Sequence, residues 1–317
     1  MSRFPLRFTF FALVGLGLFT AGPGRAADGL RGVDGYDDGT DGKEQPAPAL
    51  PGRPRTDKSQ YHLFNPTPVD LLRPFSSSRP DQTTGPHSVD AGHFYLETGV
   101  SYGLDLGATR TDTWTAFQST HFRAGLFNNV ELELIYNGLQ GTRTQALKTG
   151  GGRTDSAILG SAATTVRFRL VLFGNDNEKF CFAIDPEVIL PTVSHHVASE
   201  YVQGDVIFTA SVKLPAGFSV TINATPGISR NADDTRNDFG FTSGVTLYHN
   251  LGPKNLRVQA YLEYYDTLVS GSSDARQADV GVRWRPWENI QLDAGCNFGV
   301  SADAPDYQPF AGVVARF

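Results

Sequence analysis

Charged side chains recur at every second position in several segments of this chain. Glu131 and Glu133 do so in one segment, and Arg167 and Arg169 do so in another. Because successive side chains of an extended strand point to opposite faces, each such pair lies on one face of one strand. Opposed acids and bases on such faces either line a water-filled path or pair with each other and close it.

The residues between these charges are apolar. In the clearest segment, Phe94, Leu96, Val100 and Tyr102 alternate with polar or small residues that include Glu97. Similar alternation recurs around residues 130–136, 166–172, 206–213, 256–264 and 278–284. A period of two indicates strands with one face in an apolar environment, not helices. We therefore expect an all-β fold.

The connections between these segments alternate in length. Short turns are expected near 128–129, 174–179, 215–217, 250–255 and 286–289, and longer polar links near 105–112, 138–155, 191–204, 226–238, 267–276 and 301–308. Short turns at one end and long loops at the other are typical of a transmembrane antiparallel up-and-down β-barrel. The count predicts about twelve strands within residues 91–317, with the alternation least clear at 114–123.

On such a barrel the charged face lines the lumen. Strand parity assigns to the lumen Glu97, Glu131, Glu133, Arg167, Arg169, Lys213, Arg257, Glu263, Asp279, Arg283 and Asp293. A barrel of about twelve strands is narrower than a porin of about 16 to 18 strands. We therefore expect side chains and the segment 61–90 to fill part of the lumen, and a selective or gated path instead of an open pore.

The N-terminal residues predict export. Arg3 and Arg7 precede an apolar run that ends before Gly24-Arg25-Ala26, which indicates a signal peptide over residues 1–26 cleaved near Ala26. Its removal takes three of the 27 basic residues and leaves 24 against 33 acidic ones, which argues against nucleic acid as a partner. Residues 27–60 are rich in Gly, Asp and Pro and predict a disordered tail.

Catalytic and metal-binding patterns were sought as well. Cys181 and Cys296 fall on opposite strand faces, which argues against a disulfide between them. His195-His196 has no Cys or patterned acid nearby, so we expect no metal site and no cofactor. Ser119 beside His121 could suggest a barrel lipase, but no local sequence marks a nucleophile. The sequence predicts no catalytic residue and no enzyme.

Residues 65–100 resemble the opening of a family of outer-membrane transporters named after a phenol-degradation (meta-pathway) gene cluster. The matching residues include Arg79, Pro80, Asp81, Pro86, Gly92 and Glu97. The stretches FRAGLFNNVELEL at 122–134 and PEVILPT at 186–192 extend the likeness over most of residues 65–317. The resemblance implies a barrel and, by gene association, uptake of aromatic or other hydrophobic compounds. The Asp-Gly-rich tail departs from the family pattern.

Taken together, the sequence predicts a bacterial outer-membrane channel for passive passage of small, hydrophobic or aromatic molecules. The alternative is a closed structural or adhesive barrel that binds an external partner through long loops, especially 138–155 and 191–204. The alternating C-terminal strand that closes on Phe317 resembles the signal read by the barrel-insertion machinery. Expected partners are therefore that machinery, outer-membrane lipid and a small-molecule substrate. The substrate, gating and oligomeric state are not encoded in any motif.

Overall fold

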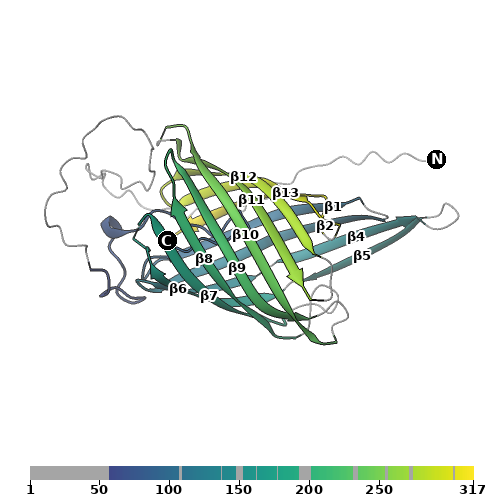
Figure 1. The fold of residues 1–317 in the computed structure, drawn as a ribbon, viewed down its shortest axis with the longest axis horizontal. Helices are drawn as coiled ribbons and strands as arrows, with labels where there is room; N and C mark the ends of the chain where they lie inside the picture. The colour runs from purple at the N-terminus through teal and green to yellow at the C-terminus, as the bar shows by residue number, and fades with distance from the viewer. Residues whose placement is uncertain are drawn as a thin grey trace, which may run out of the picture. The chain divides into compact units, whose positions relative to one another are not determined.

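The computed structural model describes residues 57–106, 109–136, 138–147, 153–161, 163–176, 178–192, 201–230, 235–253, 256–270, 274–302 and 304–317. All of them belong to one compact unit, which is a β-barrel (Figure 1). The predicted signal peptide lies outside the described residues, as does the predicted tail apart from its last four positions. The His195-His196 pair also lies outside them.

Fourteen strands are described, with one turn of 3₁₀ helix, η1 (Val69–Leu71), before them. The strands are β1 (Phe94–Asp105), β2 (Thr109–Phe127), β3 (Val130–Tyr136), β4 (Leu139–Leu147), β5 (Arg153–Ser161), β6 (Thr164–Phe173), β7 (Phe180–Leu190), β8 (Gln203–Lys213), β9 (Phe218–Arg230), β10 (Asn237–Leu251), β11 (Val258–Val269), β12 (Ala275–Trp287), β13 (Ile290–Gly299) and β14 (Tyr307–Arg316). No helix in the described part of the chain is long and apolar enough to span a membrane.

Four of the fourteen strands form two interrupted strands of the barrel, since β3 continues into β4 and β5 continues into β6. Both β3 and β4 pair with β2, over its C-terminal and N-terminal parts respectively, while β5 pairs with β4 and β6 pairs with β3. All other strands pair with their neighbours in sequence, and β1 pairs with both β14 and β2, which closes the sheet. The predicted antiparallel barrel of twelve strands is therefore confirmed.

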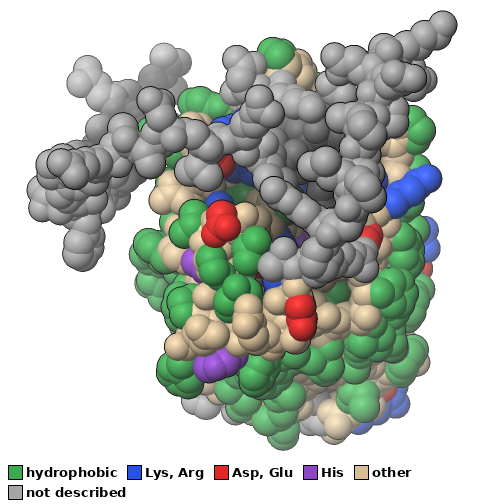
Figure 2. All heavy atoms as spheres, turned by 90° about the vertical axis from the view of Figure 1, so that its left-hand side faces the viewer, with side chains coloured by type: hydrophobic (Ala, Val, Ile, Leu, Met, Phe, Trp, Pro, Cys, Tyr) green, Lys and Arg blue, Asp and Glu red, His purple; other side chains and the backbone are tan. Residues whose placement is uncertain are grey.

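The interior and exterior of the barrel reverse the usual distribution of side chains. The largest fully buried side chains are charged, among them Arg123, Arg169 and Glu131, whereas Leu172, Val282 and Trp284 are exposed. Figure 2, which faces the end of the barrel with the short turns, shows hydrophobic side chains along its outer sides. An apolar exterior around a charged interior is expected of a barrel that is surrounded by lipid.

Two expected loops are mostly strand. The predicted link at 105–112 is replaced by a connection of three residues, because β2 already begins at Thr109. The predicted loop 138–155 is largely β4 and β5, whose cross-strand partners include Thr113 with Thr142. Polar residues occupy both faces of β4, as with Thr142 and Arg143, and Figure 1 shows β4 and β5 extending beyond the neighbouring strands. The period-two apolar signal is therefore absent, although the backbone pairing continues.

Candidate functional site

The chain that precedes β1 crosses the barrel lumen. The backbone N–H of Ser78 donates to the Glu97 carboxylate on β1 at 3.0 Å, and that of Thr83 donates to Glu263 on β11 at 2.7 Å. The next N–H in the chain donates to Asn223 on β9 at 2.7 Å. Because these strands lie around the circumference of the barrel, the segment that reaches all three lies inside it. We call residues 73–90 the lumen segment.

The lumen segment is tethered at the rim with the short turns. Arg73 donates from its backbone N–H to Asp90 at 2.8 Å and from its side chain to Asp176 at 3.0 Å. Lys58 holds the same Asp176 carboxylate at 2.9 Å. Burial acts to raise the pKa of Asp176, but the hydrogen bond from Lys58 and the charge of Arg73 outweigh it and lower the pKa below its ordinary value. Both ends of the segment are therefore fixed close to the β6–β7 turn.

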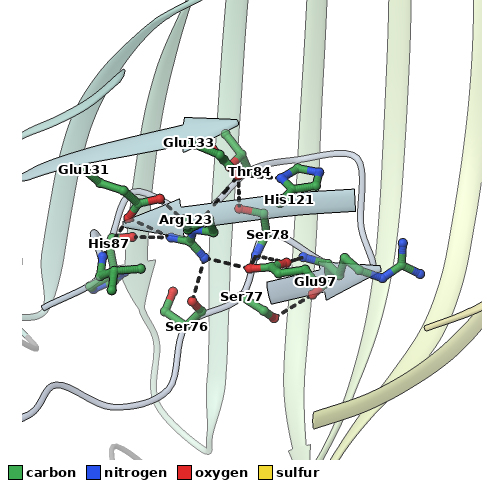
Figure 3. A network of polar contacts seen from close by, with 12 residues as sticks. Ser76, Ser77, Ser78, Thr84, His87, Glu97, His121, Arg123, Glu131 and Glu133 are labelled. Atoms are coloured by element: carbon green, nitrogen blue, oxygen red, sulfur yellow. Dashed lines mark hydrogen bonds and ion pairs between the residues drawn. The ribbon is translucent and has the colours of Figure 1, made fainter. Parts of the chain in front are cut away.

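One wall of the lumen, which we call the first wall, is formed by β1, β2, β3, β6 and β7 and carries a network of paired charges (Figure 3). Its centre is Arg123, which donates to Glu131 at 2.6 and 3.0 Å and to Glu97 at 2.9 Å. Arg123 also donates to the carbonyl of Ser76 in the lumen segment at 2.9 Å. A bidentate, charge-assisted contact of this kind fixes the geometry of both side chains.

The first wall continues the same pattern along β6 and β7. Arg167 donates to Glu133 on β3 at 3.2 Å and to Glu187 on β7 at 2.6 Å. Arg169 donates twice to Asp185 on β7, at 2.8 and 3.0 Å. Each of these side chains lies opposite an unlike charge on a neighbouring strand. Since an unpaired buried charge is very costly, the strands of this wall compensate one another.

The opposite side of the lumen, formed by β9 to β13, is paired differently. We call it the second wall. Arg283 on β12 forms an ion pair with Asp81 of the lumen segment, and Asp293 on β13 binds Arg79 of that segment at 3.0 Å. Arg283 and Asp293 are themselves register partners across β12 and β13. The charges of this wall thus find their partners on the lumen segment instead of on the neighbouring strand.

Two acids of the second wall face each other. Glu263 and Asp279 are register partners on β11 and β12, and both are buried. The Glu263 carboxylate accepts hydrogen bonds from the N–H groups of Gln82 and Thr83 and from the hydroxyl of Thr246. Like charges directly opposite each other destabilise a strand pair. The donors of the lumen segment offset part of that repulsion.

Cavities lie on both sides of the lumen segment. Its residues 78–82 and Thr84 line an outer cavity of about 280 Å³ toward the long-loop end, together with Arg167, Glu187 and Asp205. Its residues 73–77 and 85–87 line inner cavities of about 160 and 200 Å³ toward the short-turn end. The segment therefore separates an outer from an inner compartment of the lumen.

The structure locates the other residues singled out from the sequence. Lys213, at the end of β8, lines both inner cavities. Arg257 lies in the turn before β11, where it lines an inner cavity and pairs with Glu288. His121 contacts Glu133 with its ring nitrogen. Both cysteines are free, with Cys181 buried and Cys296 partly exposed. Within the described residues, no group of three or more potential ligand side chains is placed to hold a metal ion.

The family-motif residues line the path of the lumen segment. Arg79 and Asp81 form the ion pairs with the second wall, and the Arg79–Pro80 peptide is cis. Pro86 lines an inner cavity. Gly92 has φ +78°, and a Cβ there would come within 2.6 Å of Pro66, so the turn into β1 requires glycine. The motif thus describes how the segment is seated in the barrel.

Several residues of the site were not identified from the sequence. They include Arg123, Asp185, Asn223 and Tyr248, whose hydroxyl donates to Asp81. Arg123 was missed because the apolar alternation around 114–123 is weak, and β2 has positive φ values there at Phe117 and Ser119. Its spacing of two residues from His121 was the available signal.

Residues 77–317 match the family described as "Putative MetA-pathway of phenol degradation". The chain therefore belongs to this family. The match begins inside the lumen segment, so the family's shared sequence covers all but the first four residues of that segment and every strand of the barrel. Among curated proteins, none matches the chain.

Solved structures of similar shape include a COG4313 outer membrane channel from Pseudomonas putida F1. It is 9% identical, with a TM-score of 0.48, over 76% of this chain and 100% of that one. The KdgM porin is 12% identical, with a TM-score of 0.40, over 69% of this chain and 99% of that one. The NanC porin is 7% identical, with a TM-score of 0.42, over 70% and 98%. With identities and TM-scores this low, no property of these proteins is transferred to this chain.

Proposed function

We propose that this protein is an outer-membrane channel for passive passage of small, hydrophobic or aromatic molecules. The observation that carries the proposal is the divided lumen, with one cavity on the outer side of the lumen segment and two on the inner side. A barrel that served only as a structural surface would have no use for buried space on both sides of a segment held by hydrogen bonds. The apolar exterior fits outer-membrane lipid as its surroundings.

The substrate class rests on the size of the cavities and on the family. Cavities of about 160 to 280 Å³ accept small molecules only. The family description refers to phenol degradation, which supports aromatic compounds as the substrates. Passage between the compartments requires residues 77–84 of the lumen segment to shift, while the first wall keeps its internal ion pairs and holds the barrel together.

The test is entry of a hydrophobic dye into cells whose outer membrane carries intact lipopolysaccharide. Expression of the full chain should speed entry of the uncharged single-ring dye 4-nitroaniline. The matched control is the variant Thr83→Cys with Gly244→Cys, because a Cβ at Gly244 would lie 3.7 Å from the Cβ of Thr83, and a disulfide there would lock the lumen segment to β10. Dye entry should fall in the oxidised variant and return on reduction.

Dye entry equal to that of cells without the protein would overturn the proposal. Heat-dependent mobility in gels would first have to show that the barrel is folded. That result would favour the closed barrel with an external partner. The described residues give this alternative less support than the sequence did, since most of the 138–155 loop is strand. In the 191–204 loop, residues 193–200 lie outside the described residues.

A further inference from the structure

The smaller inner cavity is lined by an unusual set of side chains. It lies at the short-turn end, between the lumen segment and strands β8 to β13. Four basic side chains contribute to its lining, namely Lys213, Arg257, Arg283 and Arg285. No carboxylate is among the described residues that line it. The outer cavity, in contrast, is lined by Asp81, Glu187 and Asp205 as well as by arginines.

Two of these bases pair with acids that lie outside the cavity lining. Arg257 is paired with Glu288, which is exposed in the β12–β13 turn, and Arg283 is paired with Asp81 on the far side of the lumen segment. The Nε–H of Arg283 is buried and has no acceptor among the described residues. A buried donor without an acceptor is costly, so this site favours a bound group that carries acceptor oxygens.

The same cavity has an aromatic side. Phe75 of the lumen segment is part of its lining. The guanidinium carbon of Arg285 lies 5.9 Å from the centre of the Phe75 ring, so the ring and the positive charge are presented side by side. The cavity volume is about 160 Å³, and an apolar protein cavity of about 150 Å³ holds one benzene molecule. There is room for one ring.

We propose that this inner cavity is a binding site for a carboxylate that carries a single aromatic ring. The carboxylate lies among Arg283, Arg285 and Lys213, and the ring lies against Phe75. The inference rests on the proposed channel function and narrows its substrates to aromatic acids. Because the outer cavity carries acids and the inner one does not, an anionic substrate is held on the inner side of the lumen segment.

The test is calorimetric titration of the full-length protein in detergent, at neutral pH and physiological salt, with benzoate and with benzyl alcohol. Benzoate is ionised under these conditions, whereas benzyl alcohol has the same ring without the charge. Benzoate should bind at least about tenfold more tightly, which is the value of one hydrogen bond between charged groups. Chloride, present throughout, cannot replace the ring contacts.

Arg285→Gln should weaken benzoate binding about tenfold and leave benzyl alcohol unchanged. Lys213→Gln provides a second variant in case the first does not fold. The matched control is Arg276→Gln, a neutralisation on the same strand β12 but at its opposite, exposed end. It should leave benzoate binding as in the wild type.

Equal affinity for benzoate and benzyl alcohol would overturn the inference. So would wild-type affinity for benzoate in both cavity variants, if both are folded. If benzoate fails to bind while dye entry persists, the anion site is wrong and the channel stands. If benzoate binds with the expected dependence on charge but dye entry is absent, the site stands and the proposed channel function is wrong.

Discussion

The two walls of the lumen compensate their buried charges in different ways. On the first wall, Arg123, Arg167 and Arg169 each bind acids on neighbouring strands. On the second wall, Arg283 and Asp293 bind the lumen segment. Removal of the segment would therefore leave the ion pairs of the first wall in place and break those of the second. The first wall forms its ion pairs within the barrel and adds hydrogen bonds to the segment, whereas the second wall forms its ion pairs with the segment itself.

The largest effect is expected at the centre of the first wall. Arg123→Met removes the cation that faces Glu97 and Glu131, both of which are fully buried. Breaking a buried ion pair typically costs about 3–5 kcal/mol. We expect a loss of that size in the free energy of unfolding, or no folding at all, measured by urea titration of the gel-mobility shift. Arg110→Met, at an exposed position on β2, is the control and should change little. An Arg123→Met barrel as stable as the wild type would refute the idea that the first wall depends on ion pairs within the barrel.

A different outcome is expected when the segment's side of the second wall is neutralised. The double variant Arg79→Gln with Asp81→Asn removes both ion pairs that hold the lumen segment to β12 and β13. The barrel should fold, and its single-channel conductance in planar bilayers should rise several-fold because the segment no longer fills the lumen stably. Conductance equal to that of the wild type would show that the segment is held by other contacts.

A smaller effect is expected from the hydroxyl that supports Asp81. Tyr248→Phe removes a hydrogen bond to that carboxylate but keeps the ring, over which the Arg283 guanidinium lies at 4.8 Å. The free energy that holds the segment in place should fall by about 1.5–3 kcal/mol, the value of one hydrogen bond to a charged group. Conductance should therefore rise, but less than in the double variant. An increase as large as that of the double variant would mean that Tyr248, and not the ion pairs, controls the position of the segment.

The smallest effect is expected at the rim. Lys58→Ala removes a partly exposed ion pair with Asp176, worth about 0.2–1 kcal/mol in the free energy of unfolding. The pKa of Asp176 is lowered in the folded protein, so this contribution is complete above the unfolded value of about 3.9 and disappears as the pH falls through the lower folded value. Urea titrations of wild type and variant should differ at neutral pH and converge in acid. A difference that persists in acid would contradict this assignment.

The sequence was sufficient for the barrel because lipid imposes a period of two on each strand it contacts. That period also separated charges inside the barrel from apolar side chains outside it, as with Arg169 and Leu172. It did not predict β4 and β5, since no lipid selects their side chains. Nor does parity distinguish the walls, because the Arg79–Asp293 and Asp81–Arg283 pairs join residues about two hundred positions apart. The seat of the lumen segment is a tertiary property without a local signature.

The register of β12 and β13 has a consequence for the energetics of the lumen segment. Arg283 and Asp293 are cross-strand partners, and in the lumen segment Arg79 and Asp81 are separated by a single residue. If the segment leaves the wall, the four charges can recombine within reach of one another, wall with wall and segment with segment. Release of the segment would then be an exchange of partners in which two ion pairs replace two ion pairs. Such an exchange lets a segment be firmly seated and still be released at a modest net change in electrostatic energy.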